Sequence, residues 1–580
     1  MEFNLYDVVA AVAAAYPERE SMVFGSRRLS ASELIGRANQ FGHALLGAGL
    51  TVSRERSALG RHESGQPHVA IYSRNRQEHI EALIGCFSAR AVPLNVNYRY
   101  LAAEVRFLFD DASVGAVVFT SEFAPVMADV IANMVTRPRL LVQIADESGH
   151  PLLGGAQWFD ELLAGQPTHA PDVHRSPDDL YGLYTGGTTG LPKLVLWRQA
   201  DAFPPLFGGR RPDSSEWDSV EEIVAASGGG VRHMPVAPFM HAAGQWPAVR
   251  ALVAGTTLVV PSLSATFDAR QFVDIVECEN VAQTNIVGDA FIWPLVDELR
   301  RRPRDILSLK RVGTGGAAAS PRARQALLAV LPHIEIYETA GASETGALLA
   351  HSTKAGGPFV SGSFTLLLRA CVLSEDRTTV LTGGSDEVGW LAATKRVPLG
   401  YLGDAAKSAA TFPIIDGVRF SLPGDRVLLR ADGLIDLLGR DSGVINTGGE
   451  KVFAEEVERA LLAHPSVYDA VVCARPSERW GTEVVAIIAA DGQATDAAIG
   501  DNVRAHTRFR KPSFGCRACS AVPTARLTWP GPVVSLKRVP WSIRRARSAQ
   551  GERGRRTWSW SCERSSRGER ARHHCSPSRR

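Results

Sequence analysis

The sequence has no long apolar run and few cysteines. None of its 580 residues lie in a stretch approaching the roughly 18 consecutive apolar residues that a membrane-spanning helix needs. Four of the eight cysteines, Cys86, Cys278, Cys371 and Cys473, stand singly along the chain, so we expect small buried hydrophobic residues rather than disulfide partners. The apolar share of 45% is that of a globular protein with a sizeable core.

The chain also has little net charge, formally +3, and that charge is unevenly distributed. Residues 516–580 contain fifteen arginines and one lysine, so the rest of the chain is acidic overall, and we expect no nucleic-acid partner. The apolar stretch Val8–Tyr16 follows Glu2 and Asp7 rather than a basic segment. It therefore predicts an amphipathic helix rather than a signal peptide, and a cytoplasmic protein.

Short apolar runs alternate with helical patterns along most of the chain. The helical patterns cover residues 78–90, 102–111 and 268–279. The strand-like runs cover residues 69–72, 114–120, 140–144, 257–260 and 333–337. This alternation predicts an α/β fold with largely parallel sheets.

The pattern changes near Arg440. A helix is expected over 453–464, because Phe453, Val457 and Leu461 share one helical face, and strands follow at 469–474 and 483–489. We predict a large N-terminal domain at 1–439, a small, incomplete α+β hinge-and-lid domain at 440–513, and a disordered arginine-rich tail at 514–580.

The most informative motif is Tyr184-Thr-Gly-Gly-Thr-Thr-Gly-Leu-Pro-Lys193, which lies between two apolar segments. Its glycines let backbone N–H groups converge on one anion, its threonines add hydroxyl donors, and Lys193 adds a positive charge. A flexible Gly/Thr linker is the alternative, but linkers do not usually join two apolar segments. The predicted nucleotide-binding residues of this phosphate loop are Thr185, Gly186, Gly187, Thr188, Thr189 and Gly190.

This loop resembles the signature of the adenylate-forming superfamily, which includes acyl-CoA synthetases, luciferases and the adenylation domains of peptide synthetases. Further matches follow in the superfamily's order over roughly residues 1–510. The resemblance makes Lys193 a catalytic residue that neutralises phosphate charge. It also implies a large N-terminal domain followed by a small lid domain.

Two further segments match the superfamily around its acyl and adenine sites. In Pro238-Phe-Met-His-Ala-Ala-Gly-Gln-Trp246 the resemblance makes His241, Gly244 and Gln245 lining residues of the acyl pocket, with plain core packing as the alternative. The turn containing Gly315, Gly316 and Ala317 resembles the one that lies against adenine. Directly after it, Ser320 and Pro321 form a helix start.

The hexapeptide Gly341-Ala-Ser-Glu-Thr-Gly346 suits Mg²⁺, a hard cation that takes oxygen ligands. By resemblance Glu344 and Thr188 contact the metal and Ser343 contacts the nucleotide. Ala340 stands where the superfamily usually has an aromatic residue beside adenine.

The Gly-Asp pair ending at Asp425, followed by Gly439-Arg-Asp-Ser-Gly-Val-Ile-Asn-Thr-Gly-Gly-Glu-Lys-Val452, is the most specific match after the phosphate loop. Asp425 resembles the carboxylate that accepts both ribose hydroxyls, and Arg440 the arginine that also reaches the ribose. Gly448 and Gly449 resemble the glycines that line the channel for CoA.

Together these motifs imply an AMP-forming acyl-CoA ligase. Its cofactors are ATP, Mg²⁺ and coenzyme A, its substrate is a fatty or steroid-side-chain acid, and any membrane contact is peripheral, through a lipid substrate. A non-catalytic nucleotide- or acyl-binding pseudoenzyme is the alternative. A peptide-synthetase adenylation domain is disfavoured, because no carrier segment follows.

The superfamily's C-terminal Gly-Lys pair is missing. Read two nucleotides out of frame, Thr524-Ala-Arg-Leu-Thr-Trp-Pro-Gly531 can encode Gly-Lys-Ala-Asp-Leu-Ala-Trp, so we hypothesise a frameshift near residue 514 and impaired adenylation. Nucleic-acid binding by arginines and tryptophans is a second interpretation of the tail, and zinc binding by its cysteines and histidines a third.

Overall fold

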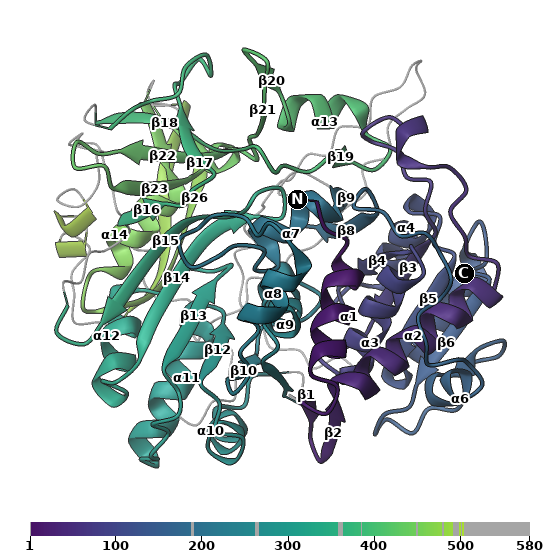
Figure 1. The fold of residues 1–580 in the computed structure, drawn as a ribbon. Coiled ribbons are helices and arrows are strands. Elements are labelled where there is room, and N and C mark those ends of the chain that lie inside the picture. The colour runs from purple at the N-terminus through teal and green to yellow at the C-terminus, as the bar shows by residue number, and fades with distance from the viewer. Residues whose placement is uncertain are drawn as a thin grey trace, which may run out of the picture. The chain divides into compact units, whose positions relative to one another are not determined.

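The computed structural model describes residues 2–186, 191–261, 266–357, 363–383, 386–447, 450–477, 481–490, 498–499 and 501–503. The chain divides into two units, residues 1–518 and 519–580, and every described residue belongs to the first. Figure 1 shows this unit as layered sheets and helices. Within the described part of the chain, none of the helices combines the length and apolarity that crossing a bilayer needs.

A five-stranded, wholly parallel sheet forms the first half of the chain, in the order β4-β3-β5-β6-β7. Its buried strands alternate their side chains between two cores, one against α1–α3 and the other against α4, α5 and the β8–β9 hairpin. The strands are β3 (His68–Tyr72), β4 (Val92–Asn95), β5 (Ala116–Thr120), β6 (Leu140–Ile144) and β7 (Gln157–Trp158). The helices are α1 (Leu5–Ala15), α2 (Ala31–Gly47), α3 (Gln77–Ser88), α4 (Ala102–Asp111), α5 (Ala124–Asn133) and α6 (Phe159–Ala164).

A large mixed sheet carries the second half. It runs parallel from β1 through β11, β10, β12 and β13 to β14, and one face of β10–β14 packs on α10–α12 (Figure 1). These strands are β1 (Glu20–Phe24), with β2 (Arg27–Ser30) at its edge, then β10 (Arg232–Pro235), β11 (Thr257–Val260), β12 (Gln283–Ile286), β13 (Arg311–Gly315) and β14 (Glu335–Ala342). The helices of this half are α7 (Gln199–Leu206), α8 (Val220–Ala226), α9 (Ala242–Val253), α10 (Ala269–Cys278), α11 (Gly288–Arg301) and α12 (Pro321–Val330).

Beyond β14 the same sheet becomes antiparallel. Its strands are β15 (Gly346–Lys354), β16 (Ser363–Leu366), β17 (Ala370–Leu373), β18 (Glu387–Thr394), β20 (Ile414–Ile415), β21 (Val418–Ser421), β22 (Asp425–Leu429) and β23 (Ile435–Arg440). A separate three-stranded sheet joins β8 (Leu180–Thr185), β9 (Lys193–Arg198) and β19 (Gly400–Tyr401), and α13 (Ala405–Thr411) follows it.

The last described residues have a hydrophobic core of their own, which includes Val457, Leu461, Val467 and Val472. The core joins β24 (Val444–Thr447), β25 (Glu450–Phe453), α14 (Ala454–Leu462), β26 (Val467–Ser477) and β27 (Gly481–Ala490). The apolar stripe predicted for the helix at 453–464 therefore faces a core.

Most of the expected secondary structure is confirmed. The helix at 102–111 and the strands at 140–144 and 257–260 have the predicted bounds, and Ser320 caps α12 by accepting a hydrogen bond from Ala323 N at 3.2 Å. The expectation that the lone cysteines are buried is wrong for Cys278 and Cys473, which are exposed. Cys278 is the last residue of the amphipathic helix α10 and lies on its solvent side. An isolated cysteine in the sequence gives no indication of which side it occupies.

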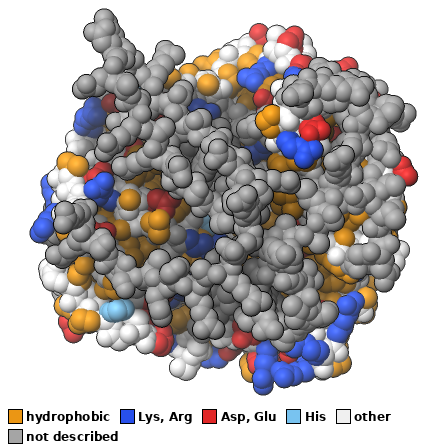
Figure 2. Space-filling model, turned by 180° about the vertical axis from the view of Figure 1, so that it is seen from behind, with side chains coloured by type: hydrophobic (Ala, Val, Ile, Leu, Met, Phe, Trp, Pro, Cys, Tyr) orange, Lys and Arg blue, Asp and Glu red, His pale blue; other side chains and the backbone are white. Residues whose placement is uncertain are grey.

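The surface of the described part carries both signs of charge. On the side shown in Figure 2, acidic, basic and apolar side chains of described residues are interspersed.

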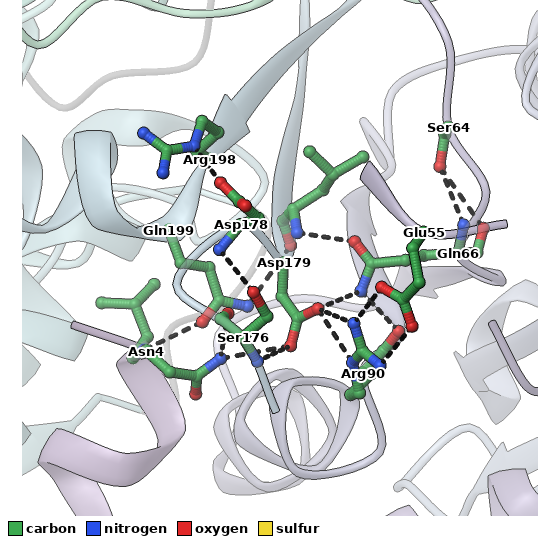
Figure 3. A network of polar contacts seen from close by, with 12 residues as sticks. Asn4, Glu55, Ser64, Gln66, Arg90, Ser176, Asp178, Asp179, Arg198 and Gln199 are labelled. Atoms are coloured by element: carbon green, nitrogen blue, oxygen red, sulfur yellow. Dashed lines mark hydrogen bonds and ion pairs between the residues drawn. The ribbon is translucent and has the colours of Figure 1, made fainter. Parts of the chain in front are cut away.

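A buried polar network fixes the entrance to β8 (Figure 3). The Asp179 carboxylate, 1% exposed, accepts hydrogen bonds from Arg90 Nε at 2.9 Å and from Gln66 Nε2 at 3.2 Å. Gln66 Oε1 in turn accepts from the backbone N–H of Leu180, the first residue of β8, at 2.7 Å. The outer side of the Arg90 guanidinium donates two hydrogen bonds to Glu55, whose side chain is 60% exposed. The strand that leads into the predicted phosphate loop is therefore held by buried charges.

Replacing Asp179 by Ala should lower the free energy of unfolding by about 3–5 kcal/mol, because it leaves the Arg90 charge buried without its inner partner. Urea denaturation measures the change. The matched control is Glu55→Ala, which removes the exposed partner of the same arginine and should cost at most about 1 kcal/mol. Equal losses in the two variants would show that burial does not set the value of this network.

Candidate active site

The predicted phosphate loop connects two paired strands, β8 and β9. Thr185 pairs with Lys193 across the mouth of the loop, and Gly186 has open space around its Cα. Gly187, Thr188, Thr189 and Gly190 lie outside the described residues. The hairpin places Lys193 at the first position after the loop, where its side chain is 42% exposed.

The ammonium group of Lys193 forms an ion pair with Asp404. Asp404 is also the N-cap of α13, where its carboxylate accepts a hydrogen bond from Lys407 N at 2.8 Å. The Lys193 hydrogen bond, followed by that of the Lys407 N–H, lowers the pKa of Asp404. The residue that caps α13 therefore also holds Lys193, the lysine predicted to neutralise phosphate charge.

Glu344 lies at the tip of the β14–β15 hairpin, and its neighbour Ser343 is half-buried there. Glu344 is 7% exposed, and its Oε1 accepts a hydrogen bond from the Tyr401 hydroxyl at 2.7 Å. Its backbone oxygen accepts from Ser421 Oγ at 2.8 Å, and Trp197 Nε1 donates to Ser343 O at 3.0 Å. Burial raises the pKa of Glu344, and the Tyr401 hydrogen bond opposes that rise.

The glycines around this tip serve the hairpin itself. A Cβ on Gly341 would lie 2.0 Å from Gly346 O, and Gly346 has φ +70°. A tight turn therefore needs both, and it places Glu344 inward.

Asp425 and Arg440 are direct cross-strand partners on β22 and β23, with Arg440 Nε donating to Asp425 Oδ1 at 3.2 Å. Burial raises the pKa of Asp425, and the Arg440 charge opposes this rise. Both residues also act electrostatically on Glu344, the arginine lowering its pKa and the aspartate raising it. The structure therefore brings Glu344, Asp425 and Arg440 together.

Tyr401 connects this group to the phosphate loop. It pairs with Val195 in β9, two residues beyond Lys193, while its hydroxyl contacts Glu344. The four predicted residues Lys193, Glu344, Asp425 and Arg440 thus lie in one connected region, although they come from three hairpins.

The predicted adenine turn faces the start of α9. Gly316 has φ +79°, and a Cβ there would lie 4.0 Å from Ala243 Cβ, whereas a Cβ on Gly315 would lie 2.9 Å from Thr339 O. Ala317 follows as an exposed residue. Gly315 therefore allows close strand packing, and Gly316 leaves room on the side of α9.

The three predicted acyl-pocket residues lie on different sides of α9. His241 is the exposed N-cap residue. Gly244 packs so closely that a Cβ would lie 2.2 Å from Ala237 O, and buried Gln245 accepts a hydrogen bond from the Tyr181 hydroxyl. Gly244 and Gln245 thus have packing partners inside the protein, and their pocket role stays a prediction.

Gly448 and Gly449, predicted for the CoA channel, lie outside the described residues. Sequence reasoning did not identify Tyr401 and Asp404. The sequence feature that could have identified them is the segment Gly400-Tyr-Leu-Gly-Asp404, which contains a helix-capping aspartate and a tyrosine. Among the described residues, no three His, Cys, Asp or Glu side chains gather as ligands of a metal ion.

Comparison with known proteins places this geometry in a family. Residues 9–380 match the family described as AMP-binding enzyme, and residues 456–526 match the AMP-binding enzyme C-terminal domain. The chain therefore belongs to the AMP-binding enzyme family.

Individual relatives agree. The chain is 46% identical over 499 residues to the medium-chain acyl-CoA ligase Mig of Mycobacterium avium, covering 85% of this chain and 90% of that protein. It is 33% identical to the 3-oxocholest-4-en-26-oate–CoA ligase of Rhodococcus rhodochrous, covering 84% and 87%. The fold resembles the anthranilate CoA ligase AuaEII in complex with anthranoyl-AMP, at a TM-score of 0.71, 18% identity and coverage of 88% and 92%.

Replacing Tyr401 by Phe should shift the acid limit of Mg²⁺-dependent ATP binding to higher pH. The hydroxyl stabilises the Glu344 carboxylate, so its loss raises a pKa that burial already raises, and more of the group is protonated at a given acidic pH. Calorimetric titrations with Mg²⁺-ATP across the acidic range measure the shift. Tyr16→Phe, far from the site, is the control, and an unchanged limit in the Tyr401 variant would contradict the assignment.

Proposed function

We propose that this chain activates a fatty or steroid-side-chain carboxylic acid with ATP and transfers the acyl group to coenzyme A. The supporting observation is the convergence of Lys193, Glu344, Asp425 and Arg440, in the order and on the elements that the motifs require. The substrates for which the relatives are named, medium-chain and long-chain fatty acids and 3-oxocholest-4-en-26-oate, support this substrate class.

In the first step the substrate carboxylate attacks the α-phosphorus of ATP, forming the acyl–phosphate bond of an acyl-adenylate while pyrophosphate leaves. Lys193 offsets the phosphate charge, and Asp425, oriented by Arg440, accepts hydrogen bonds from the ribose hydroxyls. Ser343 and the Gly315–Ala317 turn contact the nucleotide, as does the phosphate loop. In the second step the CoA thiolate attacks the acyl carbon and AMP leaves.

The Glu344 carboxylate fits a magnesium ion. Glu344 offers one oxygen, Oε2, beyond the Tyr401 hydrogen bond, and Mg²⁺ prefers a site with one or two carboxylates whose other ligands are phosphate oxygens and water. Thr188 supplies a hydroxyl in our proposal. The bound ion would neutralise charge on the phosphates.

We propose the domain boundaries 1–439, 440–513 and 514–580, with Asp441 at the hinge. The separate core of the described residues from 445 onward supports a lid that folds around its own centre. Rotation of this lid would admit CoA past Gly448 and Gly449. A cytoplasmic location stays a prediction.

We also propose that adenylation is weak, because the lysine-bearing C-terminal segment is replaced by out-of-frame residues. The support is the shifted reading of the segment 524–531, which restores Gly-Lys; the match to the C-terminal domain itself extends to residue 526. Losing one preorganised cationic donor typically lowers the rate by about 10²–10³. Without the lysine the chain approaches the alternative, a nucleotide-binding pseudoenzyme.

Restoring the shifted frame from residue 514 onward should raise pyrophosphate release by about 10²–10³, while ATP binding changes little. A coupled pyrophosphate assay with a panel of fatty and sterol acids measures the first quantity, and calorimetry measures the second. Changing the restored lysine to alanine is the control. Equal rates of pyrophosphate release with and without the lysine would contradict the proposal that its loss weakens adenylation.

Replacing Asp425 by Asn should weaken ATP binding by about 10- to 100-fold, because charge-assisted hydrogen bonds to the ribose are lost. Asp432→Asn, in an exposed turn beside Arg430, is the matched control and should leave the affinity unchanged. If the two variants bind ATP equally well, Asp425 does not hold the ribose.

A further inference from the structure

The face of the large sheet opposite α10–α12 carries a row of polar side chains. Parallel pairing places Gln283 beside both His233 and Arg311, and the next row brings together Asn285, Gly313 and Tyr337. The residues between them, among them Met234, Val312 and Ile336, point to the other face and pack in the core. All of these polar side chains are half-buried.

The polar side chains are ordered by mutual contacts. His233 Nε2 donates to Asn285 Oδ1 at 2.6 Å, and burial lowers the pKa of His233 to about 4, so this histidine is a neutral donor. Gly313 makes room for the amide, since a Cβ there would lie 2.5 Å from Asn285 Nδ2. The Arg311 guanidinium lies over the Tyr337 ring, 4.1 Å from its centre.

Helix α9 adds a second arginine to this group. Ala243, Trp246 and Arg250 form the less buried stripe of α9, at i, i+3 and i+7, while residues 247–249 and 251–253 are buried. The helix contacts β10 and β12, and the Arg250 charge contributes to the lowered pKa of His233. Arg250 therefore approaches the polar row from the opposite side.

Arg250 is exposed, yet it lies close to other charged and polar side chains. Surrounding protein lowers its pKa, with the neighbouring Arg311 charge lowering it further. Among the described contacts it donates one hydrogen bond, to Leu206 O at the end of α7, at 3.1 Å. A guanidinium has five N–H donors, so most of those of Arg250 make no hydrogen bond to a described residue.

The distance along α9 relates this cluster to the reacting end of the site. Ala243 faces the Gly316 turn, and Arg250 lies seven residues further on, about 10 Å at 1.5 Å per residue. An acid whose carboxylate reacts beside Gly316 and which follows α9 would bring its far end to Arg250. A plain methyl terminus there would remove water from a cation without replacing its hydrogen bonds.

We propose that His233, Arg250, Asn285, Arg311 and Tyr337 form the distal end of the acyl site and select acids with an oxygen acceptor, a carbonyl or a second carboxylate, at the end remote from the reacting group. This inference rests on the proposed function, because it takes α9 as a wall of the acyl pocket. Arg250 is the residue that donates hydrogen bonds to the distal oxygen.

The test uses non-reacting acyl-adenylate analogues, so that it does not depend on the rate of adenylation. Three acyl groups of one length are compared by calorimetry: decanoyl, its ω-oxo counterpart and its ω-carboxyl counterpart. The full-length chain should bind an oxygen-tipped analogue at least about tenfold more tightly than the decanoyl one. A gain with the carboxyl analogue alone identifies an anionic group, and a gain with both identifies any acceptor; each supports the proposal.

Arg250→Met should abolish this preference, and Arg250→Lys should keep part of it for the carboxyl analogue. Arg304→Met, which removes an exposed arginine paired with Asp274, is the control and should leave the ratio unchanged. Equal or tighter binding of the decanoyl analogue, or an unchanged ratio in the Met variant with unaltered thermal unfolding, overturns the proposal. Binding of all three no tighter than AMP would instead contradict the acyl-ligase function itself, and this inference with it.

Discussion

The hydrogen bond between Tyr401 and Glu344 is the contact on which the geometry of the site depends. It joins the small β8–β9–β19 sheet, which carries the phosphate loop, to the tip of the β14–β15 hairpin of the large sheet. A carboxylate buried to this extent is costly unless hydrogen bonds and charges compensate it. The Tyr401 hydroxyl and the Arg440 charge supply that compensation. The Tyr401 hydrogen bond therefore both orients the Glu344 carboxylate and links the two sheets.

Charge is handled in the same way elsewhere in the site. Lys193 is paired with Asp404, and Asp425 with Arg440, so these two predicted nucleotide contacts each have a charged partner from a different element. Asp404 also caps α13, which connects the position of the lysine to the start of a helix. Phosphate and ribose groups would therefore enter a region in which the charges are already placed, the arrangement that electrostatic preorganisation requires.

Elements with a strong period could be predicted from the sequence, and tertiary pairings could not. The helix at 102–111 and the strand at 140–144 follow from their apolar spacing alone. The pairing of Tyr401 with Glu344 spans 57 residues and depends on how two sheets meet, which no local pattern encodes. The 341–346 segment predicted a magnesium ligand, but it did not show that Gly341 and Gly346 are needed to close a hairpin. The helical period does predict which residues of α9 share a face. If the helix begins at Ala242, one face carries Ala243, Trp246 and Arg250, and another carries Gly244 and Gln245.

The central claim is that Lys193, Glu344 and Asp425 act on a single nucleotide. A crystal structure with a bound acyl-adenylate analogue and Mg²⁺ tests it most directly. The account predicts that the ribose hydroxyls bind Asp425 and that the metal binds Glu344. It also predicts that the Lys193 ammonium group contacts the phosphate, with its ion pair to Asp404 either broken or kept. A nucleotide bound elsewhere, or one that contacts Asp425 while Lys193 and Glu344 point away from it, would contradict the account.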